Sequence, residues 1–229
     1  MDLYWCGAIM GKCLVSISEQ AFFSIITSAL EAYKVEHGMN AGGSSAYVET
    51  FGHLWGYKKI DELSGDGLYR VVWADTSTAV DRHRDSIAPK DAAQELKQDF
   101  VDVFFPEVSY LGDFHSHPYS LLLDGVSTEL EVERKGLYKF SDSDFKSVKY
   151  LQDEAFLSYQ VGLVVTVFER EQQVKRSFKL LDGASCLRFQ YKNLTIWIKS
   201  YVWDGDLDSG YRRKADRMVR LKCQGLIFE

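Results

Sequence analysis

The stretch Leu111-Gly112-Asp113-Phe114-His115-Ser116-His117-Pro118 places two histidines two residues apart in a segment of β-strand character. Residues i and i+2 of a strand point to the same face, so His115 and His117 present their imidazoles side by side. Neutral imidazoles are common zinc ligands, and a catalytic zinc usually takes three protein ligands and keeps one position open for water. Because Pro118 cannot donate to a sheet ladder, we predict that the strand ends there, with both rings beside a loop.

A third ligand stands downstream in Ser141-Asp142-Ser143-Asp144, where a helical pattern begins. Asp144 would lie in the first turn of this helix, where the helix dipole favours an ionised carboxylate. A serine followed three residues later by an acidic residue is also typical of a helix cap. Ser141 and Asp144 therefore either cap the helix only, or cap it and also serve a metal.

Hydrolysis at a metal also needs a base that accepts the proton of water. A carboxylate is available upstream in Glu49-Thr50-Phe51-Gly52-His53-Leu54-Trp55-Gly56. Residue type alone favours a different interpretation, in which Glu49 is a solvated glutamate on an edge strand. Its distance along the chain from the histidines leaves this choice open.

Taken together and in this order, Glu-Thr-x-Gly-x-Leu-x-Gly, His-Ser-His-Pro and Ser-x-x-Asp resemble the JAMM (MPN+/JAB) zinc metalloprotease family, in particular its prokaryotic-type isopeptidases for ubiquitin-like proteins. The resemblance implies that His115, His117 and Asp144 bind one catalytic Zn²⁺ ion. It further implies that Glu49 is the general acid/base and that Ser141 stabilises the tetrahedral intermediate. The spacing between His117 and Asp144 is longer than is usual in the family, which indicates an insertion at about 119–139.

The family's activity leads to a functional expectation. The protein would be a zinc-dependent isopeptidase or peptidase that hydrolyses the amide bond after the C-terminus of a ubiquitin or ubiquitin-like protein, in deconjugation or precursor processing. Its partner would be that protein, bound through its C-terminal tail. Two alternatives stay open: a JAB-type processing peptidase with a substrate unrelated to ubiquitin, as in phage tail assembly, and an inactive MPN scaffold that binds proteins.

The interleaved helices and strands predict an α/β fold, and the resemblance implies the JAMM/MPN (cytidine-deaminase-like) fold with a central mixed β-sheet flanked by helices. We expect residues 12–170 to form the metalloprotease core, including the insertion at 119–139. Residues 171–229 are expected to form a β-rich C-terminal extension that packs on the core. The 119–139 segment is either a solvated loop or a flap that binds substrate.

Composition narrows the function classes. The net charge of −6 argues against a general nucleic-acid-binding protein. The four cysteines include no Cys-x-x-Cys pair, which argues against a structural zinc ribbon in this chain and fits reduced thiols. The N-terminus has the wrong charge order for a secretory signal, and no apolar run is long enough to span a bilayer. We therefore expect a cytoplasmic protein without membrane partners.

Hydrophobic periodicity predicts a core-packing helix over about 19–37, with its apolar stripe on Phe22, Ile26, Ala29 and Tyr33. A second helix, starting at Pro89, carries an apolar stripe on Ala92, Leu96, Phe100 and Val103. Gly52 and Gly56 indicate bends or close approaches of the backbone within a strand. The locally basic segment 211–222 predicts a solvated terminal helix.

Overall fold

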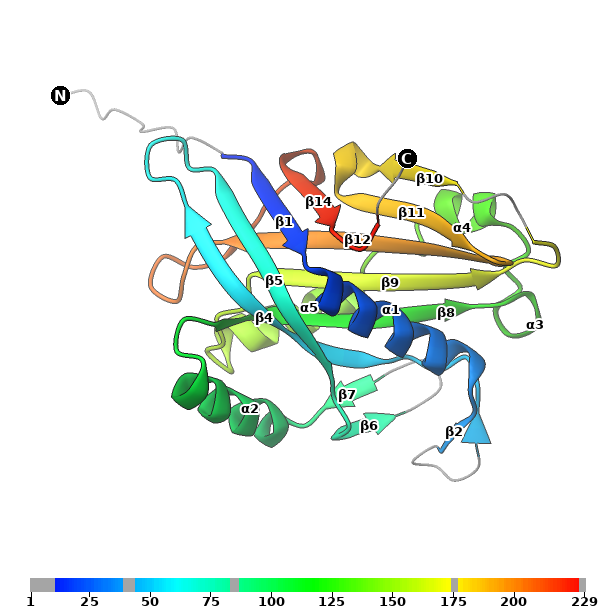
Figure 1. Ribbon diagram of the computed structural model, residues 1–229, viewed down its shortest axis with the longest axis horizontal. Helices are drawn as coiled ribbons and strands as arrows, with labels where there is room; N and C mark the ends of the chain where they lie inside the picture. Colours follow the sequence, from blue (N-terminus) through cyan, green and yellow to red (C-terminus); the bar gives the residue numbers. More distant parts are fainter. Residues whose placement is uncertain (1–10, 39–43, 83–86, 174–176, 227–229) are drawn as a thin grey trace.

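The computed structural model describes residues 11–38, 44–82, 87–173 and 177–226. It is an α/β protein whose large mixed β-sheet is flanked by helices (Figure 1). The helices are α1 (Glu19–Lys34), α2 (Asp91–Phe104), α3 (Leu121–Asp124), α4 (Glu129–Lys135) and α5 (Asp142–Asp153), with short 3₁₀ turns η1 (Asp182–Ala184) and η2 (Asp216–Met218). The strands are β1 (Cys13–Ile17), β2 (His37–Gly38), β3 (Ser44–Ser45), β4 (Phe51–Ile60), β5 (Gly67–Thr76), β6 (Val80–Arg82), β7 (Ile87–Pro89), β8 (Ser109–Tyr119), β9 (Val161–Glu169), β10 (Phe178–Leu181), β11 (Cys186–Tyr191), β12 (Leu194–Asp204), β13 (Arg212–Arg213) and β14 (Val219–Cys223).

The strands of the main sheet follow the order β10-β11-β12-β9-β8-β4-β5-β1-β14, with β13 paired to β12. Strand β8 lies at its centre, antiparallel to β4 and parallel to β9. The strands after residue 170 belong to this same sheet, because β12 pairs with β9 and β14 pairs in parallel with β1. The C-terminal residues therefore extend both edges of the sheet on which the histidines lie.

One face of the sheet packs on α1. Ser18 caps this helix by accepting a hydrogen bond from the backbone N–H of Ala21, as Ser, Thr, Asp and Asn do at helix starts. The predicted apolar stripe is confirmed, since Ile26, Ala29 and Tyr33 are buried and Phe22 packs against the same core. This core collects side chains from β14 through β11, so the sheet curves around α1.

The opposite face carries α5 and α4, with α2 beside the sheet (Figure 1). Phe145, Val148 and Leu151 of α5 pack with Val164 of β9 and Tyr201 of β12. The two faces are thus covered by different helices, as expected of a sheet that is apolar on both sides.

The residues 119–139, predicted to be an insertion, form α3 and α4 and are anchored to the sheet. Val132 of α4 is fully buried in a cluster with Phe168 and Trp197. Glu133 of α4 accepts a hydrogen bond of 2.8 Å from Arg188 of β11. The exposed leucines Leu121, Leu122 and Leu123 lie on the short helix α3.

The two glycines predicted to mark close approaches do so. A Cβ atom on Gly52 would lie 2.0 Å from the carbonyl oxygen of Asp75, and one on Gly56 would lie 1.9 Å from that of Arg70. Both positions are in β4 and face the neighbouring strand β5, so only glycine allows the backbones to come this close.

Four sequence predictions are wrong in part. Helix α1 ends at Lys34, because His37 and Gly38 pair with β3. Helix α2 begins at Asp91, because Pro89 belongs to β7 and pairs with β6. Strand β8 runs to Tyr119, one residue beyond Pro118. The segment 211–222 forms no helix among its described residues, but β13, a 3₁₀ turn and β14. Strand β14 alternates buried and exposed residues with a period of two, a pattern that its basic residues hid because they occupy the exposed positions.

The described cysteines, Cys13, Cys186 and Cys223, are buried and free, in agreement with the expected reduced thiols; Cys6 lies outside the described residues. Among the described residues, none forms a helix that is both long and apolar enough to cross a bilayer.

Candidate metal site

Strand β8 brings His115 and His117 to one face of the sheet, as their spacing predicts. Both residues are buried, and each is less than 10% exposed. Between the two histidines, the backbone N–H of Ser116 points toward the β4 side of β8 and donates to the carbonyl oxygen of Thr50. Because backbone groups alternate, the nitrogen of Pro118 also points toward β4, which begins only at Phe51. Pro118 therefore removes no ladder bond, and β8 can continue past it.

Helix α5 brings Asp144 to the same place. Its N-terminus is a complete capping box: the Ser141 hydroxyl accepts from the Asp144 backbone N–H, and the Asp144 carboxylate accepts from the Ser141 N–H at 2.6 Å. The Ser141 hydroxyl also donates to Oδ2 of Asp144 at 2.8 Å. Capping and metal binding are thus compatible at this residue, because Asp144 caps the helix while it faces the histidines.

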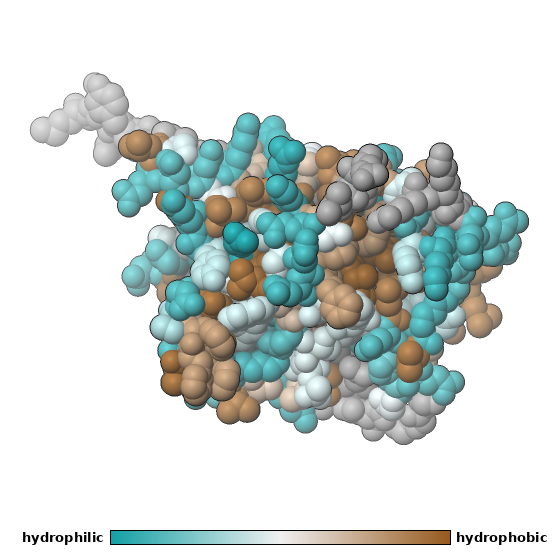
Figure 2. Space-filling model, viewed as in Figure 1, coloured by the Kyte–Doolittle hydropathy of each residue, from teal (hydrophilic) through white to brown (hydrophobic). Residues whose placement is uncertain are grey.

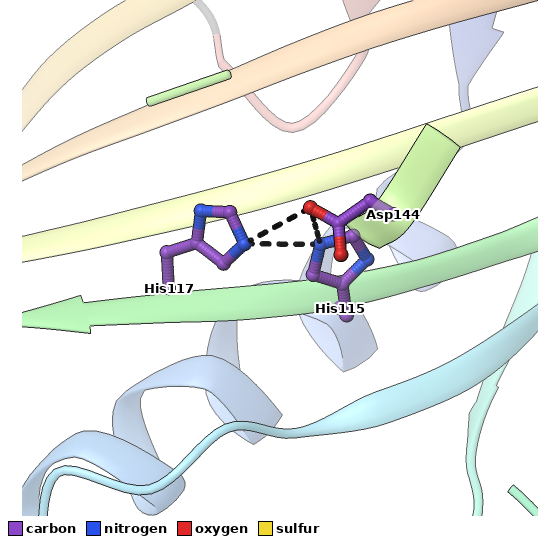
Figure 3. Close-up of side chains that lie close together, drawn as sticks. All are labelled: His115, His117 and Asp144. Atoms are coloured by element: carbon purple, nitrogen blue, oxygen red, sulfur yellow. Dashed lines mark hydrogen bonds and ion pairs between the residues drawn. The ribbon is translucent and has the colours of Figure 1, made fainter. Parts of the chain in front are cut away.

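The three side chains form a nearly regular triangle of ligand atoms (Figure 3). The two Nε2 atoms of His115 and His117 lie 3.2 Å apart, and Oδ2 of Asp144 lies 3.4 Å and 3.5 Å from them. A tetrahedral ion with ligands at about 2.0–2.1 Å requires separations of about 3.3 Å between ligand atoms. Two imidazoles and a carboxylate at these separations could hold a metal ion, and the donor set fits zinc.

The surroundings adjust the charges of the three ligands. Burial lowers the pKa of His115, which favours the neutral imidazole that a metal needs. Burial also opposes protonation of His117, but Asp144 and Glu49 outweigh it and raise the pKa of His117. Burial would raise the pKa of Asp144, but the two histidines hold that pKa well below its usual value. Asp144 is therefore ionised and carries the negative charge of the ligand set.

Glu49 lies next to the three ligands. Strand β4 pairs Phe51 with His115 in an antiparallel register, and continuing this register places Glu49 opposite His117. Its charge acts on the His117 ring, and its side chain lines the same cavity as His115 and Asp144. This neighbourhood supports the interpretation of Glu49 as a functional residue over that of an edge-strand glutamate.

The cavity beside the triangle has a volume of about 400 Å³ and is lined by residues of β4, β8, α5 and the segment before β9. It contains a carboxylic acid that the sequence analysis missed. Asp113 is buried and accepts a hydrogen bond of 2.7 Å from the hydroxyl of Tyr159. Burial raises the pKa of Asp113 to about 7. The sequence could have identified Asp113, because this residue precedes His115 by two positions in a strand and so points to the same face.

The C-terminal strands hold the segment that carries Ser141 and Asp144. The hydroxyl of Tyr201 accepts from the backbone N–H of Phe140 at 3.1 Å, and the two rings are in contact, tilted by 39° with centroids 4.5 Å apart. The guanidinium of Arg213 lies 4.8 Å from the ring centre of Phe145, in the first turn of α5. The basic C-terminal stretch thus contributes a contact beneath the site.

We expect Ser141→Ala to lower the free energy of unfolding by about 1 kcal/mol, because it removes a helix cap. Thr128→Ala is the matched control, since Thr128 caps α4 in the same way by accepting from the Glu131 N–H. Both losses can be measured by urea unfolding. Only Ser141 also donates to Asp144, so only Ser141→Ala should weaken zinc binding in a metal titration. Equal zinc affinity in the two variants would show that the Ser141 hydroxyl serves the cap alone.

No model of a known protein family matches this chain, and no curated protein is significantly similar to it.

Proposed function

We propose that this protein is a zinc-dependent isopeptidase or peptidase of the JAMM type. Its substrate would be the amide bond that follows the C-terminus of a ubiquitin or ubiquitin-like protein, in the cytoplasm. The observation that supports this most is the triangle of His115, His117 and Asp144, with Glu49 on the wall of the same cavity. The motif order in the sequence supports the same family and its fold.

A zinc ion held by His115, His117 and Asp144 would polarise the scissile carbonyl and make water more acidic. Glu49 would accept the proton of the attacking water and return it to the leaving amine. The Ser141 hydroxyl, which donates to Asp144 in this structure, would turn its proton toward the oxyanion of the substrate.

This chemistry needs no covalent enzyme intermediate. The described cysteines are buried, and burial raises the pKa of the Cys186 and Cys223 thiols, which disfavours the nucleophilic thiolate. A cysteine-protease mechanism at these residues would need the opposite shift. Water activated beside Glu49 is therefore the nucleophile that we propose.

Elemental analysis tests the metal site and requires no substrate. We expect about one zinc per purified chain, and loss of that zinc in His115→Ala and in Asp144→Ala, because each removes one of three ligands. His37→Ala is a matched control, since His37 lies outside the triangle and contacts the carbonyl oxygen of Glu31. It should keep its zinc.

The outcomes separate the proposal from the scaffold alternative, whereas the JAB-type processing peptidase differs only in its substrate. Zinc that is lost in both ligand variants justifies an activity screen on ubiquitin-like precursors and conjugates. A wild-type protein that stays free of zinc after reconstitution would contradict the proposal and favour a scaffold role.

A further inference from the structure

Helix α2 turns its apolar stripe toward solvent. Leu96 is 71% exposed, Phe100 55%, Val103 71% and Phe104 62%, and we call these four residues the α2 stripe. Figure 2 shows the apolar patch over this helix, at the lower left. Large apolar residues gathered on one exposed helix face are typical of surfaces that bind a partner. The periodicity of the sequence identifies this stripe, but it does not say which way the stripe faces.

A groove of about 580 Å³ runs beside the stripe. Its walls are mainly aromatic and aliphatic and include Trp55, Trp73, Leu96, Phe100 and Phe105. Trp73 and Phe105 meet edge to face with ring centroids 4.8 Å apart. Trp55 is fixed in place, because its indole N–H donates to Asp75 at 2.6 Å. The groove is therefore a preformed apolar pocket at the foot of the stripe.

Acidic side chains border the stripe. Glu95, Asp99 and Asp102 recur at i, i+4 and i+7, one residue before Leu96, Phe100 and Val103, so they form a parallel row along the helix. All three are exposed. Lys97, on the groove side, forms an ion pair with Asp75 and so does not offset this row. The surface thus combines an apolar centre with a negative edge.

We propose that the α2 stripe and its groove bind an amphipathic helical segment of a partner protein, whose apolar side chains are flanked by Lys or Arg. The apolar side chains would fill the groove between Trp73 and Phe100, and the basic residues would lie along Glu95, Asp99 and Asp102. Complementary charge is the argument for this occupant. In a dimer formed through this surface, the acidic rows of the two copies would repel each other. The same row would repel an anionic membrane surface.

This surface is separate from the metal site. The groove and the cavity beside His115 share no lining residue. Binding at α2 can therefore be measured on the full chain without any assay of hydrolysis, and its result does not depend on the proposed enzymatic function.

The probe is a synthetic amphipathic helix with leucines on one face and lysines on both flanks, compared with a twin that carries glutamates in place of the lysines. Fluorescence anisotropy measures the affinity of each peptide for the full-length protein. Leu96→Gln/Phe100→Gln should weaken binding of the lysine peptide about thirtyfold, because it removes the apolar anchors. Glu95→Lys/Asp99→Lys/Asp102→Lys should weaken it about tenfold and improve binding of the glutamate twin. The control is Leu122→Gln, which changes a leucine on α3 that is 88% exposed.

Each outcome decides the proposal. Loss of binding in both α2 variants, with unchanged circular dichroism and an unchanged control, supports it. Absence of saturable binding, equal binding of the glutamate twin, or binding that ignores the α2 variants overturns it. Sedimentation that shows a dimer dissolved by Leu96→Gln/Phe100→Gln, or capture of the protein by phosphatidylserine vesicles through the stripe, would also overturn it and assign the stripe to that other occupant.

Discussion

On the mechanism proposed above, Glu49→Gln is expected to lower turnover about a thousandfold without loss of zinc, because a positioned general base typically contributes about 10²–10⁴ to the rate. Glutamine preserves the shape of the side chain but cannot accept the proton of water. Glu49 lines the same cavity as His115 and Asp144, but it contributes no ligand atom to the triangle. Loss of rate without loss of metal is therefore the result that follows from its position.

The measurement pairs elemental analysis with kcat on whichever ubiquitin-like precursor or conjugate the wild type hydrolyses. Glu49→Asp is the matched variant, since it keeps the carboxylate but shortens its reach, and it should retain part of the rate. Asp144→Asn completes the comparison, because it should lose zinc and rate together. Wild-type turnover in Glu49→Gln would remove this residue from the mechanism and leave only the metal site to be explained.

The histidine pair was the most predictable part of the site. A spacing of two residues is enough to place His115 and His117 on one face of a strand. Asp144 and Glu49 depend on pairings that spacing does not specify. Glu49 reaches His117 through the register of β4 on β8, and Asp144 reaches it because α5 packs on the face of the sheet opposite α1. Only the motif order linked these four residues before the structure did.

Two other features show why local sequence patterns were not enough to predict the whole fold. The apolar stripe of α2 was predicted correctly as a stripe, but whether it faces the core or solvent depends on what the sheet leaves uncovered. The helix predicted over 211–222 is replaced by β13, a 3₁₀ turn and the edge strand β14, and β14 pairs in parallel with β1, about 200 residues earlier in the chain. Such pairing depends on tertiary context, which can override local preference.

The C-terminal residues also contain a charge cluster around one buried lysine, and this cluster supports the site. Lys199 of β12 is fully buried; its Nζ lies 2.6 Å from the Ser185 hydroxyl, 2.8 Å from Asp216 and 3.2 Å from Asp182. Asp182 also accepts a hydrogen bond of 3.1 Å from the hydroxyl of Tyr138. Because Tyr138 lies just before the cap of α5, the cluster helps to fix the segment that presents Asp144.

Burial would raise the pKa of Asp182, but Lys199 outweighs it and lowers that pKa. A carboxyl whose folded pKa is depressed stabilises the fold above its unfolded pKa of about 3.9, and this stabilisation is lost as the pH falls through the folded pKa. The contribution of Lys199 is therefore fully present at neutral pH and declines in acid.

Lys199→Met is expected to lower the free energy of unfolding at neutral pH by about 3 kcal/mol, because it removes the buried cation from two partly buried carboxylates and leaves Asp182 only the more exposed Lys139. This value is at the low end of the range for breaking a buried ion pair, because the Asp216 side chain is 34% exposed and is screened by water. Urea unfolding of Lys199→Met and of the wild type at about pH 7 and at about pH 3 should show the deficit shrinking in acid, because the contribution of Lys199 to the wild type declines below the unfolded pKa of about 3.9. The matched variant is Lys199→Met/Asp182→Asn/Asp216→Asn. It should recover most of the lost stability, because it also removes the two carboxylate charges that Lys199 balances. If Lys199→Met loses the same amount at both pH values and the triple variant recovers nothing, then packing around Lys199, and not its charge, holds the Tyr138 segment in place.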